Sequence, residues 1–203
     1  MIELLAATTN RGKLEEITHL FAQDFVAVKL YCLADFNITA QCPEDGLTFA
    51  QNAAAKALYY SLLVPGVLTA GDDSGLTVEI LNGAPGVFSS RYSGPDATDD
   101  KNTTKLLTQL KNIPNRNAKF VTAVCLAQDG KIVASFTGEV AGQIIDERRG
   151  SHGFGYDPVF YYPPFNKTFA QLTTLEKNNI SHRARAFVQL RDFLKELPTN
   201  FTN

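Results

Sequence analysis

The sequence predicts an α/β protein built on a mixed β-sheet with flanking helices. Two observations lead to this prediction. Apolar runs typical of buried strands alternate along the chain with segments whose apolar residues recur every three or four positions, as in helices. In addition, Asp129-Gly130 separates two strand-like runs, and this two-residue signal is typical of an antiparallel hairpin. Since no stretch has the composition of a linker, residues 1–203 are expected to form a single domain, which could consist of two lobes around a cleft.

The expected elements follow one another with turn residues between them. In order they are strand Ile2–Thr8, helix Arg11–Phe21, strand Phe25–Tyr31, helix Thr48–Leu63, strands Val67–Ala70 and Leu76–Leu81, helix Asp99–Lys111, strands Lys119–Gln128, Lys131–Val140 and Gly142–Asp146, and helix Ser181–Leu197. Two helix starts carry capping signals. Asn10 is the expected N-cap of the first helix, and Thr48 with Gln51 forms a capping-box pattern at the second.

Charge and cysteine content argue against several classes of protein. A net charge of −2 gives no general attraction to a nucleic acid. The three cysteines, Cys32, Cys42 and Cys125, lack a C-x-x-C spacing and are expected to be reduced thiols rather than disulfides or zinc ligands. The apolar N-terminal run is too short for a signal peptide or a membrane span. We therefore expect a cytoplasmic protein with a small ligand and no nucleic-acid or membrane partner.

The first candidate site segment is Thr8-Thr9-Asn10-Arg11-Gly12-Lys13, where a strand runs through a polar turn into a helix. The unpaired amides of a first helical turn and the positive end of its dipole favour an anion there. Lys13 could fold back over a bound phosphate. The spacing is not that of a P-loop. Taken alone, a capped helix with a solvated lysine explains the same residues.

The second segment is Gly71-Asp72-Asp73-Ser74-Gly75, which lies between two apolar runs. Buried carboxylates are costly unless they are paired or bind a metal, and Mg²⁺ prefers one or two carboxylates together with water and substrate phosphates. The segment therefore predicts metal-assisted hydrolysis, with a surface turn as the alternative.

Two further segments carry polar side chains that folding alone does not explain. Gly153-Phe154-Gly155-Tyr156-Asp157-Pro158 could offer ring faces to a flat ligand. Downstream, His182 and Arg183 fall in the first turn of the last helix, where cations oppose the helix dipole, so a ligand oxygen is a better explanation for them. A weaker feature is Pro43-Glu44-Asp45-Gly46, followed by Asn52 and Lys56 on one helical face.

Together these segments resemble the inosine/xanthosine triphosphate pyrophosphatase family, in the same order and spacing from Ala7 to Arg183. Six runs carry the resemblance: Thr8-Thr9-Asn10-Arg11-Gly12-Lys13, Gly46-Leu47-Thr48-Phe49 with Asn52 and Lys56, Asp72-Asp73-Ser74-Gly75-Leu76, Gly83-Ala84-Pro85-Gly86 with Ser90-Arg91-Tyr92, Gly153-Phe154-Gly155-Tyr156-Asp157-Pro158, and Ile180-Ser181-His182-Arg183. The resemblance implies a long mixed sheet with flanking helices, two lobes around a central substrate cleft, a homodimer, and Mg²⁺-dependent hydrolysis of ITP, dITP and XTP to the nucleoside monophosphate and pyrophosphate.

The resemblance also implies roles for particular residues. Asp73 would be the general base and a magnesium ligand beside Ser74, and Lys13 and Lys56 would be the catalytic cations. Family members often carry two acids just before the Gly-x-Thr-Phe run, whereas this chain has Pro43-Glu44, so Glu44 is the second candidate ligand. The triphosphate would be held by Thr8, Thr9, Asn10, Arg11, Gly12 and Lys13.

Base recognition would fall to the C-terminal segments: Phe154, Gly155, Tyr156 and Asp157 would cover the base and ribose, and Lys177, His182 and Arg183 would read the base. Donor-only groups such as Lys177 and Arg183 suit the oxygen at C6 of hypoxanthine and xanthine better than the amino group of adenine. Two alternatives remain at this point. One is a pyrophosphatase for pyrimidine or modified nucleotides, and the other is a nucleotide-binding sensor without turnover.

Overall fold

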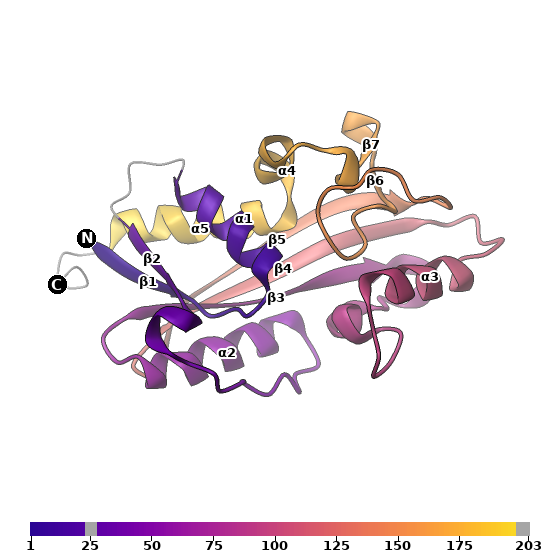
Figure 1. Cartoon of the computed structure of the whole chain (residues 1–203). Coiled ribbons are helices and arrows are strands. Elements are labelled where there is room, and N and C mark those ends of the chain that lie inside the picture. The colour runs from indigo at the N-terminus through magenta and orange to yellow at the C-terminus, as the bar shows by residue number, and fades with distance from the viewer. Residues whose placement is uncertain (23–27, 198–203) are drawn as a thin grey trace. The chain divides into compact units, whose positions relative to one another are not determined.

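The computed structural model describes residues 1–22 and 28–197 of the chain (Figure 1). The helices and strands are β1 (Ile2–Ala6), α1 (Arg11–Ala22), β2 (Val28–Cys32), α2 (Phe49–Leu63), β3 (Leu68–Val78), α3 (Asp99–Gln109), β4 (Asn117–Gln128), β5 (Lys131–Ile144), β6 (Phe160–Tyr162), β7 (Lys167–Thr168), α4 (Thr174–Ile180) and α5 (His182–Glu196). The strands form one sheet in the order β2-β1-β3-β4-β5-β6-β7. Since β1 pairs in parallel with β2 and β3, whereas β6 pairs antiparallel with β5 and β7, the predicted mixed α/β sheet is confirmed.

The chain divides into two compact units. Unit 1 contains Met1–Asp73, Thr122–Gly138 and the C-terminal segment from His182, and unit 2 contains Ser74–Val121 and Glu139–Ser181. The division interrupts β3, β4 and β5, so each unit takes part of these three strands.

Unit 1 has helices on both faces of its strands (Figure 1). One face packs against α1 and α5 through a cluster that includes Leu4, Ala6, Leu68 and Ala70. On the other face, alanines of α2 pack against β4 in a second cluster. Because successive side chains of a strand point to opposite faces, β4 is apolar on both sides, with Val124 and Leu126 in the first cluster and Ala123 and Ala127 in the second.

The segment Gly71-Asp72-Asp73-Ser74-Gly75 lies inside a strand, so the prediction of two separate strands on either side of it is wrong. β3 runs without a break from Leu68 to Val78 and includes Asp72 and Asp73. Glycine and aspartate are poor strand formers, which is why the sequence predicted that a strand ends on either side of this segment. At Gly71 the absence of a side chain is needed, because a Cβ there would lie 2.5 Å from both the Ala53 carbonyl oxygen and the Ala57 amide of α2.

Other local predictions can be compared directly with the structure. The capping box of Thr48 and Gln51 is confirmed at the start of α2. The hairpin is confirmed as well, with positive φ at both Asp129 (51°) and Gly130 (74°), as a tight two-residue turn requires. The separate strand expected at Gly142–Asp146 is wrong, because β5 continues to Ile144. Residues 25–27 of the second predicted strand lie outside the described residues, and its remainder coincides with β2.

Unit 2 contains the elements that local sequence did not predict. β6 has three residues, β7 has two and α4 has seven, all too short for a clear apolar period. β6 contributes Phe160 and Tyr162, and α4 contributes Ile180, to an apolar cluster that also includes Phe169 and Leu172. Aromatic packing dominates this cluster, with the rings of Phe120 and Phe160 centred 4.4 Å apart.

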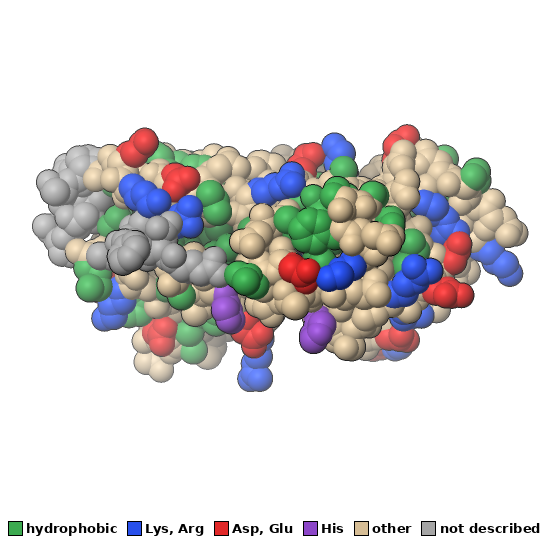
Figure 2. Space-filling view, turned by 90° about the horizontal axis from the view of Figure 1, so that it is seen from above, with side chains coloured by type: hydrophobic (Ala, Val, Ile, Leu, Met, Phe, Trp, Pro, Cys, Tyr) green, Lys and Arg blue, Asp and Glu red, His purple; other side chains and the backbone are tan. Residues whose placement is uncertain are grey.

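The surface carries charges of both signs. On the face seen in Figure 2, lysine and arginine side chains are interspersed with acidic ones rather than gathered over one element. Among the described residues, no helix has the length and apolar character needed to cross a membrane.

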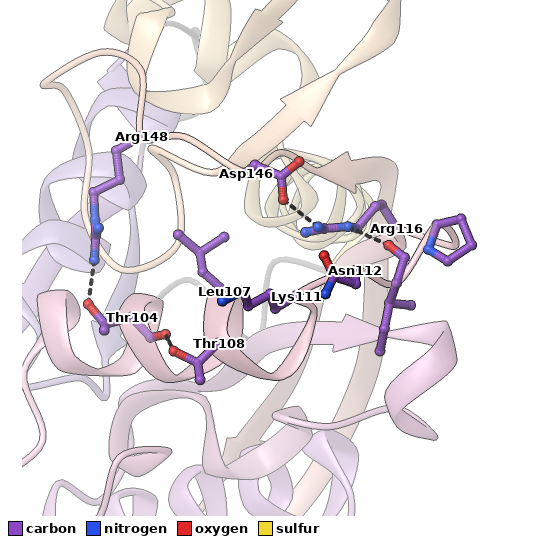
Figure 3. A pocket seen from close by; sticks show the side chains of 10 residues that line it. Thr104, Leu107, Thr108, Lys111, Asn112, Arg116, Asp146 and Arg148 are labelled. Carbon is purple, nitrogen blue, oxygen red and sulfur yellow. Dashed lines mark hydrogen bonds and ion pairs between the residues drawn. The ribbon is translucent and has the colours of Figure 1, made fainter.

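A hollow of about 890 Å³ in unit 2 is lined by residues of α3 and the segments after it (Figure 3). Its arginines are engaged by the wall itself. Arg116 donates to the Ile113 carbonyl and pairs with Asp146, and Arg148 donates to the Thr104 hydroxyl at 2.7 Å. None of the residues predicted for the functional site lines this hollow.

We expect Gly71→Ala to destabilise the protein, because the added Cβ would meet backbone atoms of α2 that can move only with the helix. A loss of roughly 1–3 kcal/mol is expected for such overpacking. Urea unfolding monitored by circular dichroism would measure it. An unchanged midpoint would show that α2 does not depend on this close approach.

Candidate functional site

The turn before α1 is held by its own polar side chains. Thr8 Oγ1 accepts the Asn10 amide at 3.2 Å, and Asn10 Oδ1 accepts the Lys13 amide at 3.0 Å. The second contact confirms Asn10 as the N-cap of α1. The first-turn amides and the helix dipole then make this end of α1 suitable for a phosphate.

Asp72 points from β3 toward α1 and α5, as Leu68 and Ala70 do. Its Oδ2 lies 2.8 Å from Lys13 Nζ and 4.0 Å from Arg183 Nε. Burial alone would raise the pKa of Asp72, but the charges of Lys13, Arg183 and Lys56 outweigh it, so the pKa lies below its ordinary value. Arg183 also forms an ion pair with Glu16 of α1. Asp72 is therefore an ionised carboxylate between buried cations.

Asp73 points to the opposite face of β3, toward α2. Its Oδ2 accepts a hydrogen bond from Asn52 Nδ2 at 2.9 Å, and its Oδ1 lies 4.0 Å from Lys56 Nζ. Lys56 Nζ in turn lies 3.3 Å from Glu44 Oε1. Burial raises the pKa of Asp73 despite Lys56, Asn52 and Lys13, and Glu44 adds to the rise. A carboxylate with a raised pKa is a better proton acceptor near neutral pH than an ordinary aspartate.

The cations at this site are themselves partly desolvated. Burial lowers the pKa of Lys13 although Asp72 pairs with it. The side chain of Lys56 is 10% exposed. Two such ammonium groups beside two carboxylates can bind the charged oxygens of a phosphate chain. The arrangement can therefore hold a polyphosphate next to a proton acceptor.

The donor set of the Glu44–Asp73 pair fits a hard cation. Lys56 Nζ lies between Glu44 Oε1 and Asp73 Oδ1, so one positive charge already reaches both carboxylates. Among the described residues there is no group of three or more histidine, cysteine, aspartate or glutamate side chains arranged for a metal. Two carboxylates completed by water and phosphate oxygens are the donors that Mg²⁺ prefers.

The glycine-rich loop of unit 2 is closed by Asp157. Its Oδ2 accepts the Phe154 amide at 3.0 Å and the Lys177 ammonium at 2.5 Å. Lys177 Nζ lies 5.0 Å from the centre of the Phe154 ring, within cation–π range. Gly153 adopts a φ of 76°, and a Cβ there would lie 2.0 Å from Asp157 Oδ2. The loop thus brings an aromatic ring and a buried ammonium together.

The rest of this loop is anchored within unit 2. Tyr156 is buried and donates to the Ser89 carbonyl at 2.8 Å, and burial raises its pKa. The Gly155 amide donates to Asp99 Oδ2 at 2.7 Å. Tyr156 therefore fixes the loop to the core, whereas Phe154 remains partly exposed.

The predicted site residues fall into two groups. Unit 1 contains Glu44, Lys56, Asp73, His182 and Arg183, together with the whole segment Thr8, Thr9, Asn10, Arg11, Gly12 and Lys13, and unit 2 contains Ser74, Phe154, Gly155, Tyr156, Asp157 and Lys177. Within unit 1 the structure joins Lys13 and Arg183 to Asp72, and Lys56 and Glu44 to Asp73. His182 is buried at the first residue of α5.

Two residues of this network were not predicted for the site. Glu16 is buried on the apolar face of α1 next to Ile17, and an acid on an apolar face is the signal that could have identified it. Asn52 is buried on α2 in an alanine-rich run, one turn before Lys56. Its spacing from Lys56 was visible, but its contact with Asp73 depends on how α2 packs on β3.

Comparisons with known proteins identify the family of the chain. A model of the Ham1 family matches residues 4–193. A protein of Desulfotalea psychrophila named dITP/XTP pyrophosphatase is 42% identical to the chain, over 93% of this chain and 83% of that protein. A protein of the same name from Listeria innocua is 41% identical over 100% and 99% of the two chains.

Solved structures match the fold of the chain. The structure of a HAM1 protein from Coxiella burnetii has a TM-score of 0.87 and 39% identity, and covers 97% of this chain and 100% of that chain. A structure named nucleoside-triphosphatase / dITP/XTP pyrophosphatase, from Mycobacterium abscessus, has a TM-score of 0.72 and 38% identity, over 95% and 100%.

The two aspartates should affect stability in opposite directions in metal-free protein. The folded state lowers the pKa of Asp72, so its charge stabilises the fold above the unfolded pKa, and this stability is lost as pH falls through the folded pKa. The folded state raises the pKa of Asp73, so its charge costs stability at neutral pH, and that cost disappears as pH falls through the folded pKa.

At pH 7 in EDTA, Asp72→Asn should therefore lose about 3 kcal/mol, since it leaves buried cations without their anion. Asp73→Asn should be as stable as the wild type or more stable. Thermal and urea unfolding of both variants would measure this, and a destabilised Asp73→Asn with an unaffected Asp72→Asn would contradict the assignment.

Proposed function

Since the chain belongs to the Ham1 family, we propose that it hydrolyses the non-standard purine nucleoside triphosphates ITP, dITP and XTP to the nucleoside monophosphate and pyrophosphate. The observation that carries the proposal is the arrangement around Asp73. The carboxylate of Asp73, which can accept a proton, lies near Lys56, and Lys56 also contacts Glu44. The residue before it on the same strand, Asp72, pairs with Lys13. Hydrolysis of a phosphoanhydride needs these functional groups: a general base, cations that bind the phosphates, and carboxylates that bind a metal.

Each charged residue has a part in the proposed reaction. The turn before α1 and Lys13 bind phosphate oxygens, and Lys56 neutralises charge that develops on them. Asp73 Oδ1 accepts a proton from the attacking water as the water oxygen bonds to the α-phosphorus. The bond from the α-phosphorus to the oxygen that bridges it to the β-phosphorus breaks, and pyrophosphate leaves with the electron pair of that bond. Asp72 keeps Lys13 and Arg183 in place.

Magnesium fits this scheme through Glu44 and Asp73. These two carboxylates would hold the ion, with water and phosphate oxygens as its other ligands. When bound, Mg²⁺ supplies charge stabilisation to the phosphate oxygens and lowers the pKa of a coordinated water.

Selection of the base is proposed for the loop that contains Phe154. The ring of Phe154 would stack on the purine, and Lys177, held by Asp157, would donate to an oxygen at C6. Arg183 and His182 are the other proposed readers of the base, while Gly155 and Tyr156 shape the loop. We further propose that the two units of the chain form a single domain and that the protein is a cytoplasmic homodimer. Its role would be to remove these nucleotides before they enter DNA or RNA.

Purified protein should release pyrophosphate from ITP and XTP only with Mg²⁺, and much more slowly from ATP, GTP and dUTP. Asp73→Asn should lower kcat by at least about 100-fold while it stays folded, because it removes the proton acceptor. A pyrophosphate-release assay across the five nucleotides measures both effects. Rapid hydrolysis of dUTP would favour a pyrimidine pyrophosphatase, and binding of ITP without turnover would favour a sensor.

Lys177→Gln should lower kcat/KM for ITP by at least about tenfold, because a buried donor to the base oxygen is lost. The loss for dUTP should be much smaller. Lys167→Gln is a matched control. Lys167 of β7 pairs at the protein surface with Glu176, which is the neighbour of Lys177 in α4. Equal losses for ITP and dUTP would contradict a role of Lys177 in base selection.

A further inference from the structure

Asn52 connects the loop that carries Glu44 to the strand that carries Asp73. The residue is 1% exposed and lies in the first turn and a half of α2. Asn52 Oδ1 accepts the Gly46 amide at 2.8 Å, and Asn52 Nδ2 donates to Asp73 Oδ2 at 2.9 Å. A single amide therefore spans from one candidate ligand segment to the other.

Lys56 spans the same gap one helical turn later. It reaches Glu44 Oε1 at 3.3 Å and Asp73 Oδ1 at 4.0 Å. These contacts are longer than those of Asn52, and they are made by a flexible ammonium that a phosphate chain would attract. The Asn52 side chain is uncharged and its two hydrogen bonds are short, so they can persist when Lys56 turns to a substrate.

The direction of the Asn52 amide decides which of its two polar groups meets Asp73. Because its Oδ1 is used by the Gly46 amide, only its NH₂ group can face Asp73. That group occupies Asp73 Oδ2 and leaves Oδ1 on the side of Lys56. Gly46 permits this geometry, because a Cβ there would lie 2.6 Å from Asn52 Oδ1.

We propose that Asn52 is a positioning residue that keeps Glu44 and Asp73 Oδ1 at a fixed separation for the metal and the water, independently of Lys56. This inference rests on the proposed function, but the link that it describes exists in the metal-free protein. The loss of Asn52 should therefore lower kcat rather than substrate affinity, because phosphate and base contacts are made by other residues.

The test uses Asn52→Leu, which has similar volume and makes neither bond, and Asn52→Asp, which keeps the acceptor for the Gly46 amide but loses the donor to Asp73. The matched control is Gln51→Ala. Gln51 is the neighbouring residue, and it accepts the Leu47 and Thr48 amides of the same loop at 2.8 and 3.1 Å without touching Asp73. It therefore reports the effect of loosening the helix start alone.

Two measurements are made on the full chain: kcat and KM for ITP with saturating Mg²⁺, and hydrogen exchange of the Gly46 amide by NMR in EDTA. Both Asn52 variants should lose about 100-fold in kcat, as expected for a displaced reacting group, with KM within about threefold. Gln51→Ala should keep kcat within about twofold, since it touches no reacting group. Gly46 exchange should accelerate at least about tenfold in Asn52→Leu, and remain near that of the wild type in Asn52→Asp and Gln51→Ala.

Retention of kcat in the Asn52 variants, or an equal loss in Gln51→Ala, would overturn the proposal. If Asn52→Leu does not fold, Asn52→Asp decides the question through kcat. If the wild type does not hydrolyse ITP, the proposed function fails, but the exchange measurement still tests whether Asn52 ties the Glu44 loop to β3. In that case, unchanged Gly46 exchange in Asn52→Leu shows that Asn52 does not hold the loop.

Discussion

The side-chain alternation of β3 is the constraint on which the candidate site depends. Asp72 and Asp73 are adjacent, so a strand sends one to each face of the sheet. Asp72 meets Lys13 and Arg183 on the α1 and α5 side, and Asp73 meets Asn52 and Lys56 on the α2 side. Two chemically identical residues therefore have pKa values displaced in opposite directions, one lowered and one raised.

This arrangement costs stability and needs support from residues that do not react. Burial of several charges is expensive unless each is paired, and the ion pair between Arg183 and Glu16 provides one such pairing. Gly71 contributes by its lack of a side chain, since it lets α2 approach β3 closely enough for Lys56 to reach the strand. The apolar clusters on both faces hold the two helix layers in place.

In unit 2 the candidate base-binding loop is shaped by its backbone conformation and by hydrogen bonds to the core, rather than by a strand. Here the backbone is shaped by Gly153 at positive φ, and the loop is tied by side chains that point inward, such as Tyr156 to the Ser89 carbonyl. Asp157 then fixes both the Phe154 amide and the Lys177 ammonium. The Phe154 amide, the Tyr156 hydroxyl and the Asp157 carboxylate are thus hydrogen-bonded within the protein, while the Phe154 ring stays partly exposed.

Local signals in the sequence were enough for the α/β class, the α2 capping box and the β4–β5 hairpin, because each depends on residues a few positions apart. Tertiary structure alone decided that Asp72 and Asp73 lie in a strand rather than a turn, since the residues that pair with these buried carboxylates come from α1, α2 and α5. Arg183 and Glu16 lie 167 positions apart in the chain. No local pattern encodes such a pairing, because it exists only once α1 and α5 pack against each other on the same face of the sheet.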